Sequence, residues 1–144
     1  MTEMPRKRPK RLWVAALMNI SLGVLALFTL GYVSTSSNVP SVIRPSGFTT
    51  AIAISTAGFL IVSSASALLG KSFGRQLMLA AALLFYGILV AQNANMLAQP
   101  HEWLGPSANT KLTASVIRGC FEILINVWAL LSAKTRGYFA LAVR

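Results

Sequence analysis

Three polar side chains interrupt the last apolar stretch of this chain, and their types and spacing could do chemistry. Arg118, Glu122 and Asn126 follow one another at intervals of four residues, so in a helix they lie along one stripe. A charged side chain near the centre of a bilayer costs from about 2.5 to roughly 10 kcal/mol or more. We therefore expect this stripe to face other helices rather than lipid.

The pair of Arg118 and Glu122 has two interpretations. Ionisable residues inside a membrane are candidates for a proton or cation site. The alternative is an internal ion pair that fixes the register of the helices, or an arginine that reaches the outer headgroups. A proton relay normally contains several titratable groups, whereas Glu122 is the single carboxylate in the apolar runs. The sequence therefore favours the structural interpretation and leaves the transport site open.

Counting residues from the expected helix ends, at 1.5 Å per residue, places other polar side chains by depth. Asn19, Ser63 and Asn126 fall in one layer near the inner side. Side-chain amides and hydroxyls bond across membrane helices more often than they bind ligands. We therefore expect these three residues to hydrogen-bond between helices.

Two further polar residues fall deeper or further out by the same count. Tyr86 lies at mid-membrane beside Glu122, and its hydroxyl is a reasonable donor to that carboxylate. Asn93 falls in the outer part of the membrane, as Arg118 does. The predicted intramembrane network, structural or transporting, comprises Arg118, Glu122, Asn126, Tyr86, Asn93, Asn19 and Ser63.

The elements that must position these residues are four apolar runs. The chain has 144 residues, of which 55% are hydrophobic and 11% charged, whereas soluble domains carry about 25% charged residues. Runs of about 20 apolar residues span a bilayer as helices. The sequence predicts an all-α polytopic membrane protein, an antiparallel up-down-up-down bundle of four transmembrane helices. The predicted spans are residues 12–32, 48–69, 76–97 and 113–133, within a transmembrane domain of residues 12–133.

The segments outside the spans set the predicted topology. Residues 1–11 form a basic arm, and residues 134–144 form a cytoplasmic or interfacial tail that either extends the last helix or lies on the membrane surface. With a cytoplasmic N-terminus, ten basic residues lie inside and Arg44 and Lys111 lie outside. This positive-inside bias predicts a multi-pass protein of the cell inner (plasma) membrane with both termini cytoplasmic.

Other kinds of site find little support in the residues. His101 and Glu102 are too few for a metal site, which usually needs three or four ligands. The three glutamates lie in separate compartments, and there is no aspartate, so no carboxylate pair is available for acid–base catalysis. Cys120 is a lone cysteine that we expect to be a small buried hydrophobe. We expect no catalytic residue, no cofactor and no metal, and the basic residues are placed as membrane charges rather than for nucleic acid.

The functional hypothesis is a small non-enzymatic membrane protein. It would act as a subunit, scaffold or partner-binding protein, of which an immunity-type protein is one form. Its surroundings would be the lipid bilayer together with a protein partner or further copies of itself. The alternative is a small oligomeric transporter or channel component that uses the intramembrane pair of Glu122 and Arg118.

Overall fold

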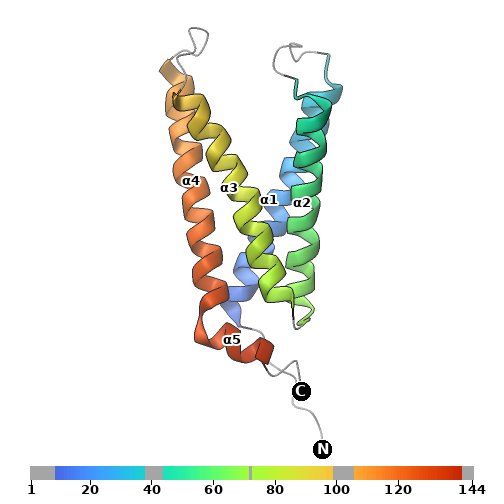
Figure 1. The fold of residues 1–144 in the computed structure, drawn as a ribbon, viewed down its shortest axis with the longest axis vertical. Coiled ribbons are helices and arrows are strands. Elements are labelled where there is room, and N and C mark those ends of the chain that lie inside the picture. Colours follow the sequence, from blue (N-terminus) through green and yellow to red (C-terminus); the bar gives the residue numbers. More distant parts are fainter. Residues whose placement is uncertain (1–8, 38–43, 72, 99–105, 141–144) are drawn as a thin grey trace, which may run out of the picture.

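The chain folds into an all-α structure whose four long helices pack antiparallel (Figure 1). The computed structural model describes residues 9–37, 44–71, 73–98 and 106–140. Each long helix is long and apolar enough to cross a membrane. The predicted four-span bundle is therefore confirmed. The helices are α1 (Lys10–Thr35), α2 (Gly47–Leu68), α3 (Gly74–Ala98), α4 (Pro106–Leu131) and the short α5 (Ala133–Ala140).

The four long helices form two pairs that diverge. Consecutive helices pack along each other, whereas the contact between α1 and α4 is much smaller. Figure 1 shows the α1–α2 pair and the α3–α4 pair meeting close to α5 and separating towards the other end of the bundle. We call these two ends the α5 end and the open end. The divergence leaves the inner faces of all four helices accessible at the open end.

The outward surface of the bundle is apolar. Phe28, Phe48, Val62 and Trp128 are each more than half exposed. So many large exposed apolar side chains suit a lipid surrounding. Cys120 is also exposed, so the prediction of a buried cysteine was wrong; it lies on the outward side of α4.

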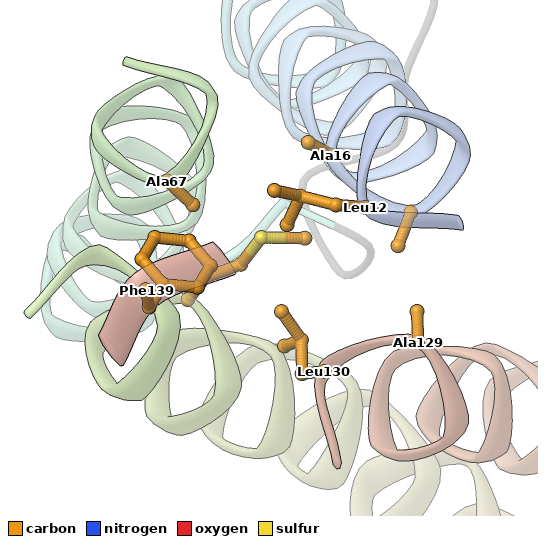
Figure 2. Packing of buried hydrophobic residues seen from close by; sticks show 8 residues of the cluster. Leu12, Ala16, Ala67, Ala129, Leu130 and Phe139 are labelled. Carbon is orange, nitrogen blue, oxygen red and sulfur yellow. The ribbon is translucent and has the colours of Figure 1, made fainter. Parts of the chain in front are cut away.

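A hydrophobic cluster closes the α5 end (Figure 2). Leu12 of α1, Met78 of α3 and Leu130 of α4 are fully buried there, and Phe139 of α5 packs against them. Arg11 adds a polar contact at this end, since its guanidinium lies 4.1 Å from the ring centroid of Trp128. Contacts from every helix therefore hold the α5 end together.

A left-handed glycine ends α2 and allows the tight turn into α3. Gly70 has a φ angle of 75°, a left-handed backbone conformation that residues with a Cβ atom rarely adopt. Its N–H donates to the carbonyl of Ala67, and the N–H of Lys71 donates to that of Ser66. This is the hydrogen-bond pattern of a Schellman motif, which satisfies carbonyls at a helix end. The motif ends α2 and leads directly into α3, which begins at Gly74.

The backbones of α2 and α3 approach closely just after this turn. A Cβ added to Gly74 would lie 2.8 Å from the Cα of Ala67. Ala57, Ser63 and Ala67 of α2 are all buried. Small residues let membrane helices pack at short range, so the small side chains of α2 set how near it comes to its neighbours.

The last span differs most from its predicted bounds of 113–133. Helix α4 begins at Pro106, and proline is favoured in the first turn because its missing N–H would be unpaired there. The helix stops at Leu131, and Ser132 separates it from α5.

Three side chains bond carbonyls near the end of α4 and so favour the break. The hydroxyls of Ser132 and Thr135 both reach the carbonyl of Ala129, and Arg136 Nε donates to that of Leu131. The tail therefore forms a separate helix across the α5 end rather than an extension of α4. Residues 1–8 of the predicted basic arm and residues 141–144 lie outside the described part of the chain.

Candidate functional site

A buried polar layer joins three of the long helices. Asn19 on α1 and Asn126 on α4 exchange two amide hydrogen bonds, with Nδ2 to Oδ1 distances of 2.7 and 3.1 Å. The hydroxyl of Tyr86 on α3 donates to the same Oδ1 of Asn19 at 2.9 Å. All three side chains are almost inaccessible. The layer therefore ties α1, α3 and α4 together with groups whose hydrogen bonds are made within the protein.

The ion pair lies next to this layer along α4. Arg118 Nε is 3.1 Å from Glu122 Oε1. Asn126 connects the two features, because its Nδ2 also donates to the backbone carbonyl of Glu122 at 2.8 Å. The two charged side chains differ sharply in environment: 70% of the arginine side chain is exposed and 9% of the glutamate. The glutamate thus belongs to the interior, and the arginine does not.

Tyr86 does not donate to Glu122, contrary to the expectation from depth. Helical side chains lean towards the N-terminus of their own helix. Helix α3 begins at the α5 end, so the tyrosine hydroxyl is carried towards that end and towards Asn19. Helix α4 begins at the open end, so Glu122 leans the other way. The expectation used only the depth of each Cα atom, which does not include the direction in which the side chain points.

Ser63 and Asn93 bond within their own helices. Ser63 Oγ donates to the carbonyl of Leu60 at 3.1 Å, and Asn93 Nδ2 donates to that of Leu89 at 2.8 Å. Short polar side chains can always return to a carbonyl three or four residues back. The structure therefore brings Asn19, Asn126 and Tyr86 into one network, with the ion pair of Glu122 and Arg118 beside it. It does not bring Ser63 or Asn93 into that network.

A crevice of about 540 Å³ lies between the two helix pairs on the open-end side of the polar layer. We call it the outer crevice. Its walls come from all four long helices and are mainly apolar. Arg118, Glu122 and Tyr86 line it, together with Gln92. The apolar lining includes Leu22, Ala26, Leu30, Ala53, Ile88 and Leu89.

Most hydroxyls that line the outer crevice are already bonded to protein. Thr29 Oγ1 donates to the carbonyl of Leu25 at 2.8 Å, and Thr56 Oγ1 donates to that of Ile52 at 2.9 Å. Arg118 is paired with Glu122 through Nε, and it also lines the crevice. The crevice is thus an apolar space with a guanidinium on one wall. Its volume lies in the range of roughly 300–1,000 Å³ typical of ligand sites.

The sequence alone identified the ion pair but not the crevice beside it. Its apolar lining residues look like any lipid-facing residue in a span, because periodicity does not tell an inward apolar face from an outward one in a membrane. Gln92 was visible as a polar residue near the end of the third run. Its position facing the crevice depends on how the helix pairs diverge.

The described residues contain no group of three histidine, cysteine, aspartate or glutamate side chains that could hold a metal. His101 and Glu102 lie outside the described residues. Compared with known proteins, the chain matches no family model, no curated protein and no solved structure. The fold and the site geometry therefore define a four-span membrane protein.

Proposed function

We propose that this is a non-enzymatic, partner-binding protein of the cell inner membrane, and that it holds its partner in the outer crevice. A small subunit, a scaffold and an immunity-type protein are forms of this function. The observation that carries the proposal is the crevice itself, an apolar space of about 540 Å³ bounded by all four long helices. Concave apolar spaces with a few polar groups are the usual form of a binding site.

The closed α5 end favours binding over passage. Beyond the crevice lie the hydrogen-bonded layer of Asn19, Asn126 and Tyr86 and then the cluster around Leu12 and Leu130. Polar groups whose hydrogen bonds are met inside the protein gain little from admitting water or ions. In this conformation, a molecule in the crevice therefore stops at the polar layer and does not pass on to the α5 end.

The orientation that we propose places the α5 end in the cytoplasm. Lys10, Lys71, Arg75 and Lys134 all belong to the ends of helices at the α5 end or to α5 itself, whereas Lys111 lies near the start of α4 at the open end. Cytoplasmic segments carry the excess of basic residues in membrane proteins. The outer crevice would then open in the outer leaflet.

Filling the crevice tests the proposal. We expect Ala53→Trp, on the crevice wall of α2, to remove a partner that accompanies the wild-type protein from its own membrane in mild detergent. Ala51→Trp on the same helix is the matched control, since Ala51 is exposed and outside the crevice lining. Native mass spectrometry measures the bound species and its stoichiometry, and would also register a second copy of the chain.

Two results would contradict this proposal. The first is that wild-type protein is repeatedly purified in mild detergent with nothing bound, which would mean that the crevice holds no partner. Equal retention of the partner by both tryptophan variants would place it elsewhere on the surface.

A small transporter or channel component is the second candidate, and one observation favours it: the crevice reaches the ion pair of Glu122 and Arg118. This candidate predicts that Glu122→Gln abolishes proton or cation flux into liposomes while the helical circular dichroism is kept. Absence of flux with wild-type protein, or flux that survives the substitution, would reject it.

A further inference from the structure

We propose that the partner held in the outer crevice is a long-chain carboxylate, with its alkyl chain between the helix pairs and its carboxylate on the guanidinium of Arg118. This inference rests on the proposed function, and it names the chemical class of the partner. It follows from three features of the crevice: its hydrogen-bond donors, the depth of its charge and the shape of the guanidinium.

The guanidinium of Arg118 brings the largest number of hydrogen-bond donors to the outer crevice. The hydroxyls of Thr29, Thr56 and Tyr86 already donate to protein oxygens. Arg118 is paired with Glu122 through Nε at 3.1 Å, and 70% of its side chain is exposed. Arginine carries five N–H donors and no acceptor. The ligand's polar part must therefore supply acceptor oxygens.

The depth of Arg118 makes acceptor oxygens in the crevice favourable partners for its exposed N–H groups. The residue follows Lys111 by seven positions along α4, or about 10 Å at 1.5 Å per residue. Its side chain does not extend back towards the interface, because Nε is held at 3.1 Å from Glu122, one turn further in. With 70% of the side chain exposed, the guanidinium faces the crevice. Glu122 supplies the counter-charge on one side of the guanidinium, and an apolar filling alone would leave the N–H donors on the exposed side without acceptors.

The guanidinium is suited to a second carboxylate. The recorded contact of Glu122 Oε1 is with Nε, and a second carboxylate would take the other end of the planar fork, where the two Nη groups lie. A cationic ligand has no such opening. Only 9% of the Glu122 side chain is exposed, and its Oε1 is already paired with Arg118, so it offers a cation little contact.

The depth also selects a carboxyl group over a phosphodiester. A carboxylic acid can enter hydrocarbon in its neutral protonated form, whereas a phosphodiester keeps its charge at neutral pH. On pairing with Arg118 the acid releases its proton to water at the membrane surface. The remaining volume is lined by residues such as Leu22, Leu30 and Ile88, which suit an alkyl chain and bury it at a gain that grows with each methylene.

Photolabelling tests this inference in the intact protein. The probe is hexadecanoic acid with a diazirine in its chain, added to wild-type protein in phosphatidylcholine nanodiscs; the matching alcohol and amine are comparison probes. Peptide mass spectrometry then locates the label. We expect the acid to label crevice residues such as Leu30 and Ile88 about tenfold more than the alcohol does. Labelling of lipid-facing Phe28 and Val62 should be equal for all three probes.

Substitutions at Arg118 connect the labelling to its charge. Arg118→Gln should reduce crevice labelling by the acid to the level of the alcohol, and Arg118→Lys should reduce it partly, because lysine keeps the charge and loses the fork. Lys111→Gln is the matched control on the same helix and should change nothing. Should Arg118→Gln fail to fold with an unpaired Glu122, the double substitution Arg118→Gln with Glu122→Gln removes both charges and should show the same loss.

The outcomes separate this inference from the proposed function. Equal crevice labelling by acid and alcohol, or stronger labelling by the amine, overturns the carboxylate while leaving a crevice that binds alkyl chains. Acid labelling that persists without Arg118 also overturns it. If the crevice takes up no probe and Ala53→Trp removes a bound protein, the partner is a protein and the inference fails alone. If the crevice takes up no probe and Ala53→Trp changes nothing, both proposals fail.

Discussion

The polar side chains inside this bundle differ in what they hold together. Asn19 is the centre of the buried layer, because it bonds to both Asn126 and Tyr86. Ser63 and Asn93 return to carbonyls of their own helices and so connect nothing. Residues of one chemical type therefore contribute unequally to stability, according to whether their partners lie on another helix.

Replacing Asn19 by leucine should reduce the free energy of unfolding by about 1–3 kcal/mol, because three interhelical hydrogen bonds are lost and two buried groups are left without a partner. Asn126→Leu should cost less, since Tyr86 keeps its bond to Asn19. Reversible unfolding in detergent mixtures measures both. Asn93→Leu is the control and should change the value by less than about 0.5 kcal/mol; a loss as large as that of Asn19→Leu would contradict the assignment.

Among the elements, the crossing of α2 and α3 and the placement of α5 determine the shape of the α5 end. The crossing is close because Gly74 has no side chain opposite Ala67. Helix α5 is held because Phe139 fills the cluster formed by the ends of the long helices. Both features are packing contacts at the α5 end, where the two helix pairs meet.

Gly74→Ala should destabilise the protein by about 1–3 kcal/mol, because the new Cβ would lie 2.8 Å from backbone of α2 and the helices would have to separate. Gly87→Ala on the same helix is the matched control. Nothing lies within 4 Å of a Cβ there, so the higher helix propensity of alanine should stabilise by up to about 1 kcal/mol. Equal effects from both substitutions would mean that the close crossing does not exist.

Phe139→Ala should free α5 from the bundle without unfolding the spans. Burial of a phenylalanine side chain is worth about 1.5–3 kcal/mol, so hydrogen exchange of residues 133–140 should speed up by about tenfold to a hundredfold. Exchange within α1–α4 should not change. Lys134→Ala, at an exposed position of α5, serves as the control. Unchanged exchange in the phenylalanine variant would show that the ring does not hold the helix.

For the whole molecule, the two ends of the bundle differ in charge and in closure. Six of the nine described basic residues lie at the α5 end, which is also the closed end: Lys10, Arg11, Lys71, Arg75, Lys134 and Arg136. The open end carries the crevice. In the proposed orientation, the crevice opens in the outer leaflet and the closed α5 end faces the cytoplasm.

Cysteine labelling tests this orientation. In a Cys120→Ala background, Ser107→Cys at the start of α4 should react with a membrane-impermeant maleimide on intact cells. Phe73→Cys, in the turn between α2 and α3, should react only after the membrane is permeabilised. Both native side chains are exposed in the structure, so access to reagent depends on the side of the membrane. The reverse labelling pattern would invert the topology.

The sequence by itself determined that lipid surrounds most of the chain and that the chain has four membrane spans. In lipid every backbone group must be bonded within the protein, so an apolar run of sufficient length becomes a helix whatever its neighbours are. This local rule explains why all four spans were predicted correctly. It also explains why the bounds of α4 differ from the prediction: a helix can begin before its apolar run, as α4 does at Pro106.

Only the tertiary structure decided which side chains meet and where the crevice lies. Tyr86 bonds to Asn19 rather than to Glu122, and the outer crevice exists because the helix pairs diverge. These features depend on the rotation of each helix about its axis and on the crossing at Gly74. The rotations are set by close packing between residues far apart in the chain, and the crossing is set by the contact of Gly74 with Ala67 across the turn between α2 and α3. The pattern of apolar residues does not predict this packing, because lipid and the protein interior are equally apolar.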